Sequence, residues 1–152
     1  MHRAFRRIAI IIAVVLGIFL ADSQTFTKAY ADSFESCVMR EVNGYREKNG
    51  LSTLAYSSKM EIGADVRAKE ISRFWSHTRP DGSDYYTADE NLIYGENIYE
   101  GEIVVSNAKD VVACWIDSAP HRANILASDF KSASVGVYEI DGERYVSLEF
   151  GY

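Results

Sequence analysis

Between Asp32 and Gly50, hydrophobic residues recur at intervals of three and four positions along the chain. The residues of this stripe are Phe34, Cys37, Val38, Val42 and Tyr45. The spacing places them on one face of an α-helix, which we expect to begin at Asp32 or Ser33. Gly50 is typical of the residue that follows a helix C-terminus, so it predicts the end of this helix.

A second helical pattern begins at Ser58. The Ser58 hydroxyl and Glu61, three residues later, have the spacing of a capping box at a helix N-terminus. The hydrophobic face of this helix is expected to contain Met60, Ala64, Ala68, Ile71 and Trp75. The small residues on this face favour close packing of the helix.

The helical pattern stops between residues 76 and 94, where Pro80, Gly82 and several Asp and Tyr residues indicate a long loop. A loop of this length is more than a connection, and we expect it to shape a functional surface. A third helix follows, with Asn107 and Asp110 as its cap and Pro120 as an interruption. Its buried side is predicted to hold Val111, Val112, Trp115 and Ile116.

Two segments near the end of the sequence, 135–140 and 144–150, are rich in β-branched and aromatic residues. Asp141 and Gly142 lie between them and form a two-residue turn signal, because both turn positions require a positive φ. Helices followed by an antiparallel hairpin predict an α+β domain rather than a doubly wound parallel sheet.

The first residues have the pattern of a secretory signal peptide. Three arginines precede an apolar run from Ile8 to Leu20, and Ala29-Tyr30-Ala31 offers a cleavage site. The apolar run is shorter than the roughly 20 residues that span a bilayer. We therefore predict that residues 1–31 are removed, that residues 32–152 form one exported domain, and that no stable membrane anchor remains.

Removal of residues 1–31 leaves 12 of the 16 basic and 21 of the 22 acidic residues, a formal charge of −9. Such an acidic domain argues against nucleic acid as the partner. We expect a monomer whose partner is an extracellular ligand or protein.

Two cysteines, Cys37 and Cys114, remain in the predicted domain. An exported chain permits one disulfide between them, and the alternative is that both are small buried apolar residues. Cys114 precedes Trp115 on the predicted buried face of its helix, which argues against a reactive thiolate.

Only two histidines, His77 and His121, remain after cleavage, and each lies beside one of the two prolines of the chain. Between them, Glu96 follows a glycine at the start of a predicted strand. Two imidazoles and a carboxylate could bind a divalent ion such as zinc, or act as an acid and a base.

Each of these residues also has a purely structural interpretation. His77 could cap the end of the second helix, and His121 could form a hydrogen bond with buried backbone. Glu96 could form a structural ion pair with Arg122 or Arg79.

Four ordered motifs resemble the bacterial branch of the CAP superfamily, which includes cysteine-rich secretory, antigen 5 and pathogenesis-related proteins. They are His77-Thr78-Arg79-Pro80-Asp81-Gly82, then Gly95-Glu96-Asn97-Ile98, then Trp115-x-x-Ser118-x-x-His121-Arg122-x-Asn124-Ile125-Leu126, and finally Val135-Gly136-Val137 with Glu149-Phe150-Gly151. The resemblance covers residues 35–152.

The resemblance implies an α-β-α sandwich with a small central antiparallel sheet flanked by helices. It also implies a cleft with two histidines and two acids, which would be His77, Glu96, His121 and, as a candidate for the fourth position, Glu149. Ser118 stands where eukaryotic relatives have a glutamate, and Ala119-Pro120 replaces the Pro-Gly of bacterial relatives.

The leading hypothesis is a secreted binding or interaction protein whose cleft takes a divalent cation, zinc or calcium, or a small ligand. The first alternative is a hydrolase, protease-like, that uses the same cleft with Glu96 or a histidine as general base. The second alternative is a lipid- or sterol-binding protein that uses the tyrosines of the long loop, Tyr85, Tyr86, Tyr94 and Tyr99.

Overall fold

The computed structural model describes residues 33–152, and the predicted signal peptide lies outside these residues. Residues Phe34–Tyr152 form one compact unit. Its helices are α2 (Phe34–Lys48), α3 (Glu61–Ile71), α4 (Ala108–Asp117) and α5 (Ala119–Leu126), with a short 3-10 helix η1 (Tyr85–Ala88). Its strands are β1 (Ala55–Tyr56), β2 (Gly95–Glu102), β3 (Ser132–Ile140) and β4 (Glu143–Gly151).

Helix α2 confirms the first helical pattern. It begins at Phe34, close to the predicted start, and ends at Lys48. Gly50 follows with a φ of 74°, a conformation that glycine adopts without steric cost. Val38 and Val42 are completely buried on the inner face of the helix.

Helix α3 is shorter than the sequence pattern predicts, at both ends. It begins at Glu61 and has Met60 as its N-cap residue, without a side-chain cap hydrogen bond, so the capping box predicted at Ser58 is wrong. The helix ends at Ile71, so Trp75 does not lie on its buried face and remains 50% exposed. Met60 is buried in the core, and its side chain has no oxygen atom that could accept a hydrogen bond from the first turn of the helix.

The capping box predicted for the third helix is present at α4. The Asn107 side chain accepts hydrogen bonds from the backbone N–H groups of Lys109 and Asp110, and the Asp110 carboxylate accepts one from Asn107. Helix α4 ends at Asp117, and Pro120 lies in the first turn of α5. The missing N–H of proline removes no helical hydrogen bond at that position. Pro120 therefore separates two helices rather than ending one.

The predicted hairpin is formed by β3 and β4, which pair antiparallel from Ser132 opposite Gly151 to Ile140 opposite Glu143. Asp141 and Gly142 make the turn with φ values of 54° and 85°, as the sequence predicts. The strand order is β1-β3-β4-β2. The antiparallel sheet is extended by β1, which pairs parallel with β3 over two residues, and β2 is the opposite edge strand.

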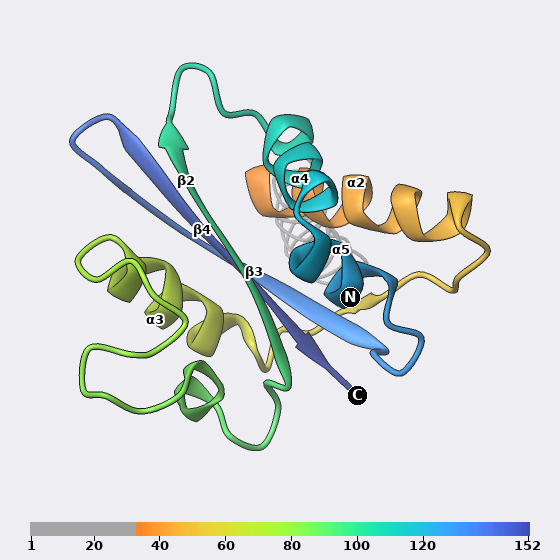
Figure 1. Ribbon diagram of the computed structural model, residues 1–152, viewed down its shortest axis with the longest axis horizontal. Coiled ribbons are helices and arrows are strands. Elements are labelled where there is room, and N and C mark those ends of the chain that lie inside the picture. Colours follow the sequence, from red (N-terminus) through yellow and green to blue (C-terminus); the bar gives the residue numbers. More distant parts are fainter. Residues whose placement is uncertain (1–32) are drawn as a thin grey trace, which may run out of the picture. The chain divides into compact units, whose positions relative to one another are not determined.

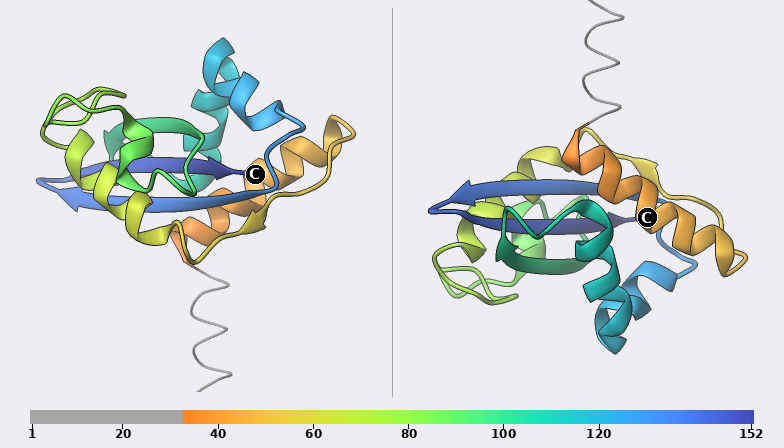
Figure 2. Two further views of the ribbon diagram at one scale, coloured as in Figure 1. Left: turned by 90° about the horizontal axis from the view of Figure 1, so that it is seen from below. Right: turned by 90° about the horizontal axis from the view of Figure 1, so that it is seen from above.

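Helices cover both faces of the sheet, which confirms the α+β class and the α-β-α arrangement. Figure 1 views the strands edge on, with α3 on one side and α2, α4 and α5 on the other, and Figure 2 shows the strands side by side. The core beneath α2, α4 and α5 contains Trp115, Val135, Val146, Leu148 and Phe150, all nearly or completely inaccessible to solvent.

On the other face of the sheet, α3 packs closely against β3 and β4. Gly136 of β3 makes this approach possible, because a Cβ there would overlap the backbone carbonyl of Ala64. The small residues Ala64 and Ala68 of α3 are completely buried. Close packing of α3 places its one fully buried charged residue, Arg67, against the sheet.

Both cysteines of the described residues are free. Cys37 is partly buried beside the core, and Cys114 is exposed on α4. The interpretation of Cys114 as a buried residue is therefore wrong, because α4 directs Val111, Val112 and Trp115 inward and turns Cys114 toward solvent. Within residues 33–152, no helix is both long enough and apolar enough to cross a membrane.

Candidate functional site

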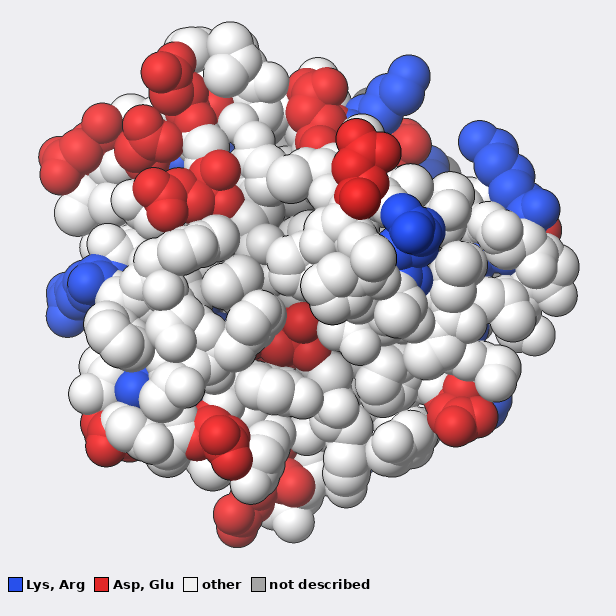
Figure 3. Space-filling model, in the orientation of Figure 1, with Lys and Arg blue, Asp and Glu red and all other residues white. Residues whose placement is uncertain are grey.

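The candidate site lies at the outer edge of the sheet, along the first residues of β2. Because β2 is an edge strand, segments that cover opposite faces of the sheet can meet beside it. On the face that looks onto this edge, acidic atoms are visible in a hollow near the middle, in front of β2 (Figure 3). Glu96, the second residue of β2, is 3% exposed.

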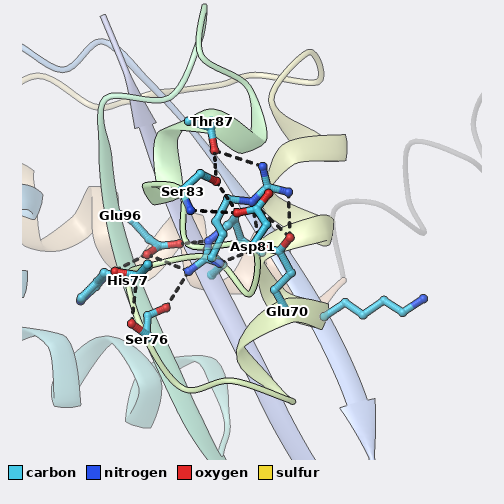
Figure 4. Close-up of polar contacts among 12 residues, drawn as sticks. Glu70, Ser76, His77, Asp81, Ser83, Thr87 and Glu96 are labelled. Carbon is cyan, nitrogen blue, oxygen red and sulfur yellow. Dashed lines mark hydrogen bonds and ion pairs between the residues drawn. The ribbon is translucent and has the colours of Figure 1, made fainter.

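His77 and Glu96 are in direct contact. The His77 Nδ1 atom lies 2.7 Å from Glu96 Oε1, and Figure 4 shows the two side chains pointing toward each other. The His77 side chain is 50% exposed, whereas the Glu96 side chain is completely buried. Tyr85 of η1 packs edge-on against the His77 ring, with the ring centres 6.3 Å apart. A carboxylate at Nδ1 orients the imidazole and leaves Nε2 available for a ligand.

His121 reaches the same place from the first turn of α5. Its ring centre is 5.9 Å from that of His77. Two amides hold α5 against β2, because Asn97 Nδ2 donates to the His121 carbonyl and Asn124 Nδ2 donates to the Glu96 carbonyl. Burial first, and then the neighbouring His77, hold the pKa of His121 below its usual value, while Glu96 acts in the opposite direction.

Arg67 is the main site residue that the sequence interpretation missed. Its guanidinium is fully buried and donates to both oxygens of Glu96, with Nε 2.7 Å from Oε2 and Nη2 3.3 Å from Oε1. It also donates to Glu70 Oε2 at 2.7 Å and to the carbonyl of Ser76, the residue before His77. Arg67 therefore fixes both the carboxylate and the backbone that carries His77.

The arginine partners that the structural interpretation assigned to Glu96 are wrong. Arg79 pairs with Glu70, with Nη2 2.7 Å from Oε1, and Arg122 donates to the Ile116 carbonyl. The ion pairs of Glu70 with Arg67 and Arg79 join the three residues into one chain. Burial acts to raise the pKa of Glu70, but the hydrogen bonds and charges of the two arginines outweigh it and lower the pKa. His77 forms its side-chain hydrogen bond with the Glu96 carboxylate and does not cap α3, which ends at Ile71.

Glu149 lies beside Glu96 but is sealed from solvent. The two residues are directly opposite each other on β2 and β4, and Glu149 is completely buried. Ser147 Oγ donates to Glu149 Oε1, whereas Glu149 Oε2 is buried with no hydrogen-bond partner among the described residues. Burial, followed by the negative charge of Glu96, raises the pKa of Glu149 well above its usual value. Burial and the neighbouring charge therefore both favour the protonated form of Glu149.

The donor atoms at this edge fit a two-histidine cation site better than a site with a full protein ligand set. Two imidazoles that share one tetrahedral zinc ion have their ring centres about 5 to 6 Å apart, which resembles the separation of His77 and His121. Glu96 already accepts hydrogen bonds from Arg67 on both oxygens. Residues 33–152 contain no group of three or more His, Cys, Asp and Glu side chains that is arranged to hold a metal ion.

The four tyrosines of the long loop and the following strand differ in their exposure. Tyr86 and Tyr94 are 42% and 46% exposed, whereas Tyr85 and Tyr99 are partly buried. The hydroxyl groups of Tyr99 and Ser106 share a hydrogen bond of 2.8 Å, and the Tyr94 ring packs at a tilt against Tyr152 with ring centres 4.6 Å apart. Two of the four tyrosines therefore contribute mainly to packing.

The model of the cysteine-rich secretory protein family, CAP, matches residues 39–150. The chain is also 25% identical over 131 residues to the uncharacterised protein YkwD of Bacillus subtilis (strain 168). That match covers 78% of this chain and 48% of YkwD, so the chain spans about half the length of this relative.

Two solved structures share the fold. An extracellular protein of Bacillus anthracis that contains an SCP domain is 21% identical, with a TM-score of 0.56 over 76% of this chain and 39% of that one. The crystal structure of NaASP2 with Zn²⁺ is 14% identical, with a TM-score of 0.59 over 79% of this chain and 82% of that one. At these identities the similarity shows the fold alone.

Proposed function

Because this chain belongs to the cysteine-rich secretory protein (CAP) family, we propose that it is an extracellular binding protein whose edge cleft takes a divalent cation through His77 and His121. The observation that carries the proposal is the convergence of the two imidazoles at 5.9 Å, one of them oriented by a buried carboxylate. NaASP2, which shares the fold, has been crystallised with Zn²⁺.

The roles of the two histidines follow from their surroundings. In this role His77 carries its proton on Nδ1 and donates a hydrogen bond to Glu96, which leaves the Nε2 lone pair for a cation, as in the carboxylate–histidine–metal arrangement. The lowered pKa of His121 keeps its ring neutral at neutral pH, and only a neutral imidazole can coordinate a cation. Both nitrogen donors suit zinc better than calcium, which prefers oxygen ligands.

Glu96 acts in this proposal as a positioning residue and not as a ligand. Its carboxylate is neutralised by the buried guanidinium of Arg67, and a cation at the same oxygens would have to displace two hydrogen bonds. The coordination positions that the two histidines leave open would be filled by water or by groups of an external ligand. A bound zinc ion would supply a Lewis acid and an anchor for such a ligand.

Isothermal titration of the purified protein with zinc at pH 7.5 tests the proposal. All proteins in the experiment carry Cys114→Ser, because Cys114 is exposed and cysteine side chains bind zinc. We expect one zinc ion per chain, and a loss of affinity of at least about tenfold in both His77→Ala and His121→Ala. The matched control is Glu102→Gln, an exposed acid at the other end of β2. Equal binding by all four proteins would refute the proposal.

A general-base hydrolase is the second candidate, and the 2.7 Å contact between His77 and Glu96 favours it. A histidine with a carboxylate at one ring nitrogen is the usual arrangement of a base and the group that orients it. A panel of ester and peptide substrates separates the two candidates. Hydrolysis that is abolished by His77→Ala and kept by Glu102→Gln would select the hydrolase.

A further inference from the structure

An apolar groove with a volume of about 350 Å³ lies beside α3, and neither histidine of the candidate site lines it. It runs between the exposed side of the C-terminal half of α3 and the loop that follows the helix. Its lining residues are Val66, Lys69, Glu70, Arg73, Phe74 and Pro80. Val66 and Phe74 are 37% and 49% exposed, so the groove presents apolar side chains directly to solvent. Apolar surface at solvent-exposed grooves marks binding sites more often than it serves stability.

The apolar surface continues along the helix toward its N-terminus. Ile62, one helical turn before Val66, is 77% exposed. The two residues lie on the same side of α3 because they are four positions apart. Neither the sheet nor any helix of the described chain covers this side, since α3 packs against β3 and β4 through its opposite face.

The groove is positively charged, although the chain as a whole is acidic. Its one acid, Glu70, is already paired with both Arg67 and Arg79. Lys69 and Arg73 are exposed, and neither forms an ion pair within residues 33–152. Two cations that form no ion pair within the described residues therefore border the groove, and the exposed Asp65, four positions before Lys69, does not line it. The lining complements a partner that presents apolar and anionic groups together.

We propose that this groove is a docking site for an acidic segment of another extracellular protein, which inserts aliphatic or aromatic side chains between Val66, Phe74 and Pro80. Its carboxylates pair with Lys69 and Arg73. The exposed side chain of Ile62 lies one helical turn beyond the groove, and an apolar surface longer than the groove itself suits a chain segment with several anchors better than a single small molecule. The groove shares the loop after α3 with the histidine cleft, but neither His77 nor His121 lines it, so docking there does not require a bound cation.

Fluorescence anisotropy with two labelled peptides tests the proposal. One peptide alternates glutamate with leucine and phenylalanine, and the other carries lysine in place of glutamate. We expect the acidic peptide to bind at least about tenfold more tightly than the basic one, and to bind more weakly as NaCl is raised. The double variant K69E/R73E should weaken the acidic peptide at least about tenfold, and Phe74→Ala should weaken it about fivefold or more.

Matched controls separate the groove from the rest of the surface. Lys109→Glu reverses an exposed charge on α4, and Val104→Ala trims a side chain that is 87% exposed, so neither should change the affinity for the peptide. His77→Ala and His121→Ala should also leave it unchanged, which distinguishes failure here from failure of the cation proposal. Equal binding of the two peptides, or insensitivity to K69E/R73E, would overturn the inference. Binding of dodecanoate that depends on Lys69 and Arg73, without binding of the acidic peptide, would also overturn it in favour of an acyl ligand.

Discussion

Glu149→Gln is expected to stabilise the protein, and to do so increasingly as the pH rises. In the folded chain, burial and the charge of Glu96 raise the pKa of Glu149, so the folded state keeps a proton that the unfolded state releases above its ordinary pKa. Because the pKa of this acid is higher in the folded state, the contribution of Glu149 to the free energy of unfolding is most favourable at low pH and declines as the pH rises. The glutamine has nearly the same shape and no proton to release.

The magnitude follows from proton linkage. While Glu149 stays protonated in the folded state, the difference in unfolding free energy between variant and wild type grows by about 1.4 kcal/mol for each pH unit above the ordinary pKa. From the ordinary glutamate value to pH 7, the limit of this gain is roughly 3.5 kcal/mol. Glutamine also retains an oxygen that can accept the hydrogen bond from Ser147.

Urea unfolding followed by circular dichroism at pH 4, 5, 6 and 7 measures this difference. Titrating groups that do not contact Glu149 are common to both proteins and cancel in the comparison, so the slope reports Glu149 together with its neighbour Glu96. Glu102→Gln, which changes an exposed glutamate, should give a difference that stays nearly constant with pH. A flat profile for Glu149→Gln, or a difference that grows toward pH 4, would refute the reasoning.

Three further predictions concern the packing of the site and the free thiols. Arg67→Met should lower the free energy of unfolding, measured with urea, by about 3 to 5 kcal/mol, because it leaves the buried Glu96 carboxylate without its cation. A loss below about 1 kcal/mol would contradict the ion-pair assignment. Gly136→Ala should cost about 1 to 3 kcal/mol by the same measurement, since the new Cβ overlaps the Ala64 carbonyl, whereas Gly44→Ala, with open space around it, should not show this steric loss. A thiol reagent such as DTNB should react faster with the exposed Cys114 than with the partly buried Cys37, and peptide mapping distinguishes the two sites. If neither thiol reacts until the protein has been treated with a reducing agent, the two cysteines form a disulfide instead.

The fold was predictable where periodicity and turn chemistry agree. The stripe around Val38 and Val42, the Asn107 cap and the Asp141-Gly142 turn each depend on local rules, and each occurs where the sequence predicts it. The start of α3 was not predictable in this way. The residue that precedes the helix, Met60, is fixed by burial in the core, and tertiary packing prevails over the local capping signal of Ser58 and Glu61.

The proximity of His77, Glu96 and His121 came from the order of the family motifs and not from spacing along the chain. Their meeting depends on the edge position of β2, which brings the loop after α3 and the start of α5 to one strand. Arg67 left a signal that was overlooked. It stands between Ala64 and Ala68 on the apolar face of the second helix, and a charged residue there requires a buried partner of opposite charge.

A crystal structure of the protein grown with zinc at pH 7.5, with anomalous data collected at the zinc edge, tests the cation proposal most directly. The account predicts one anomalous peak in the cleft at the edge of β2, bonded to Nε2 of His77 and to a ring nitrogen of His121, with Glu96 still paired with Arg67. A peak elsewhere, or a cleft without a peak while the two rings keep their present separation, would contradict it.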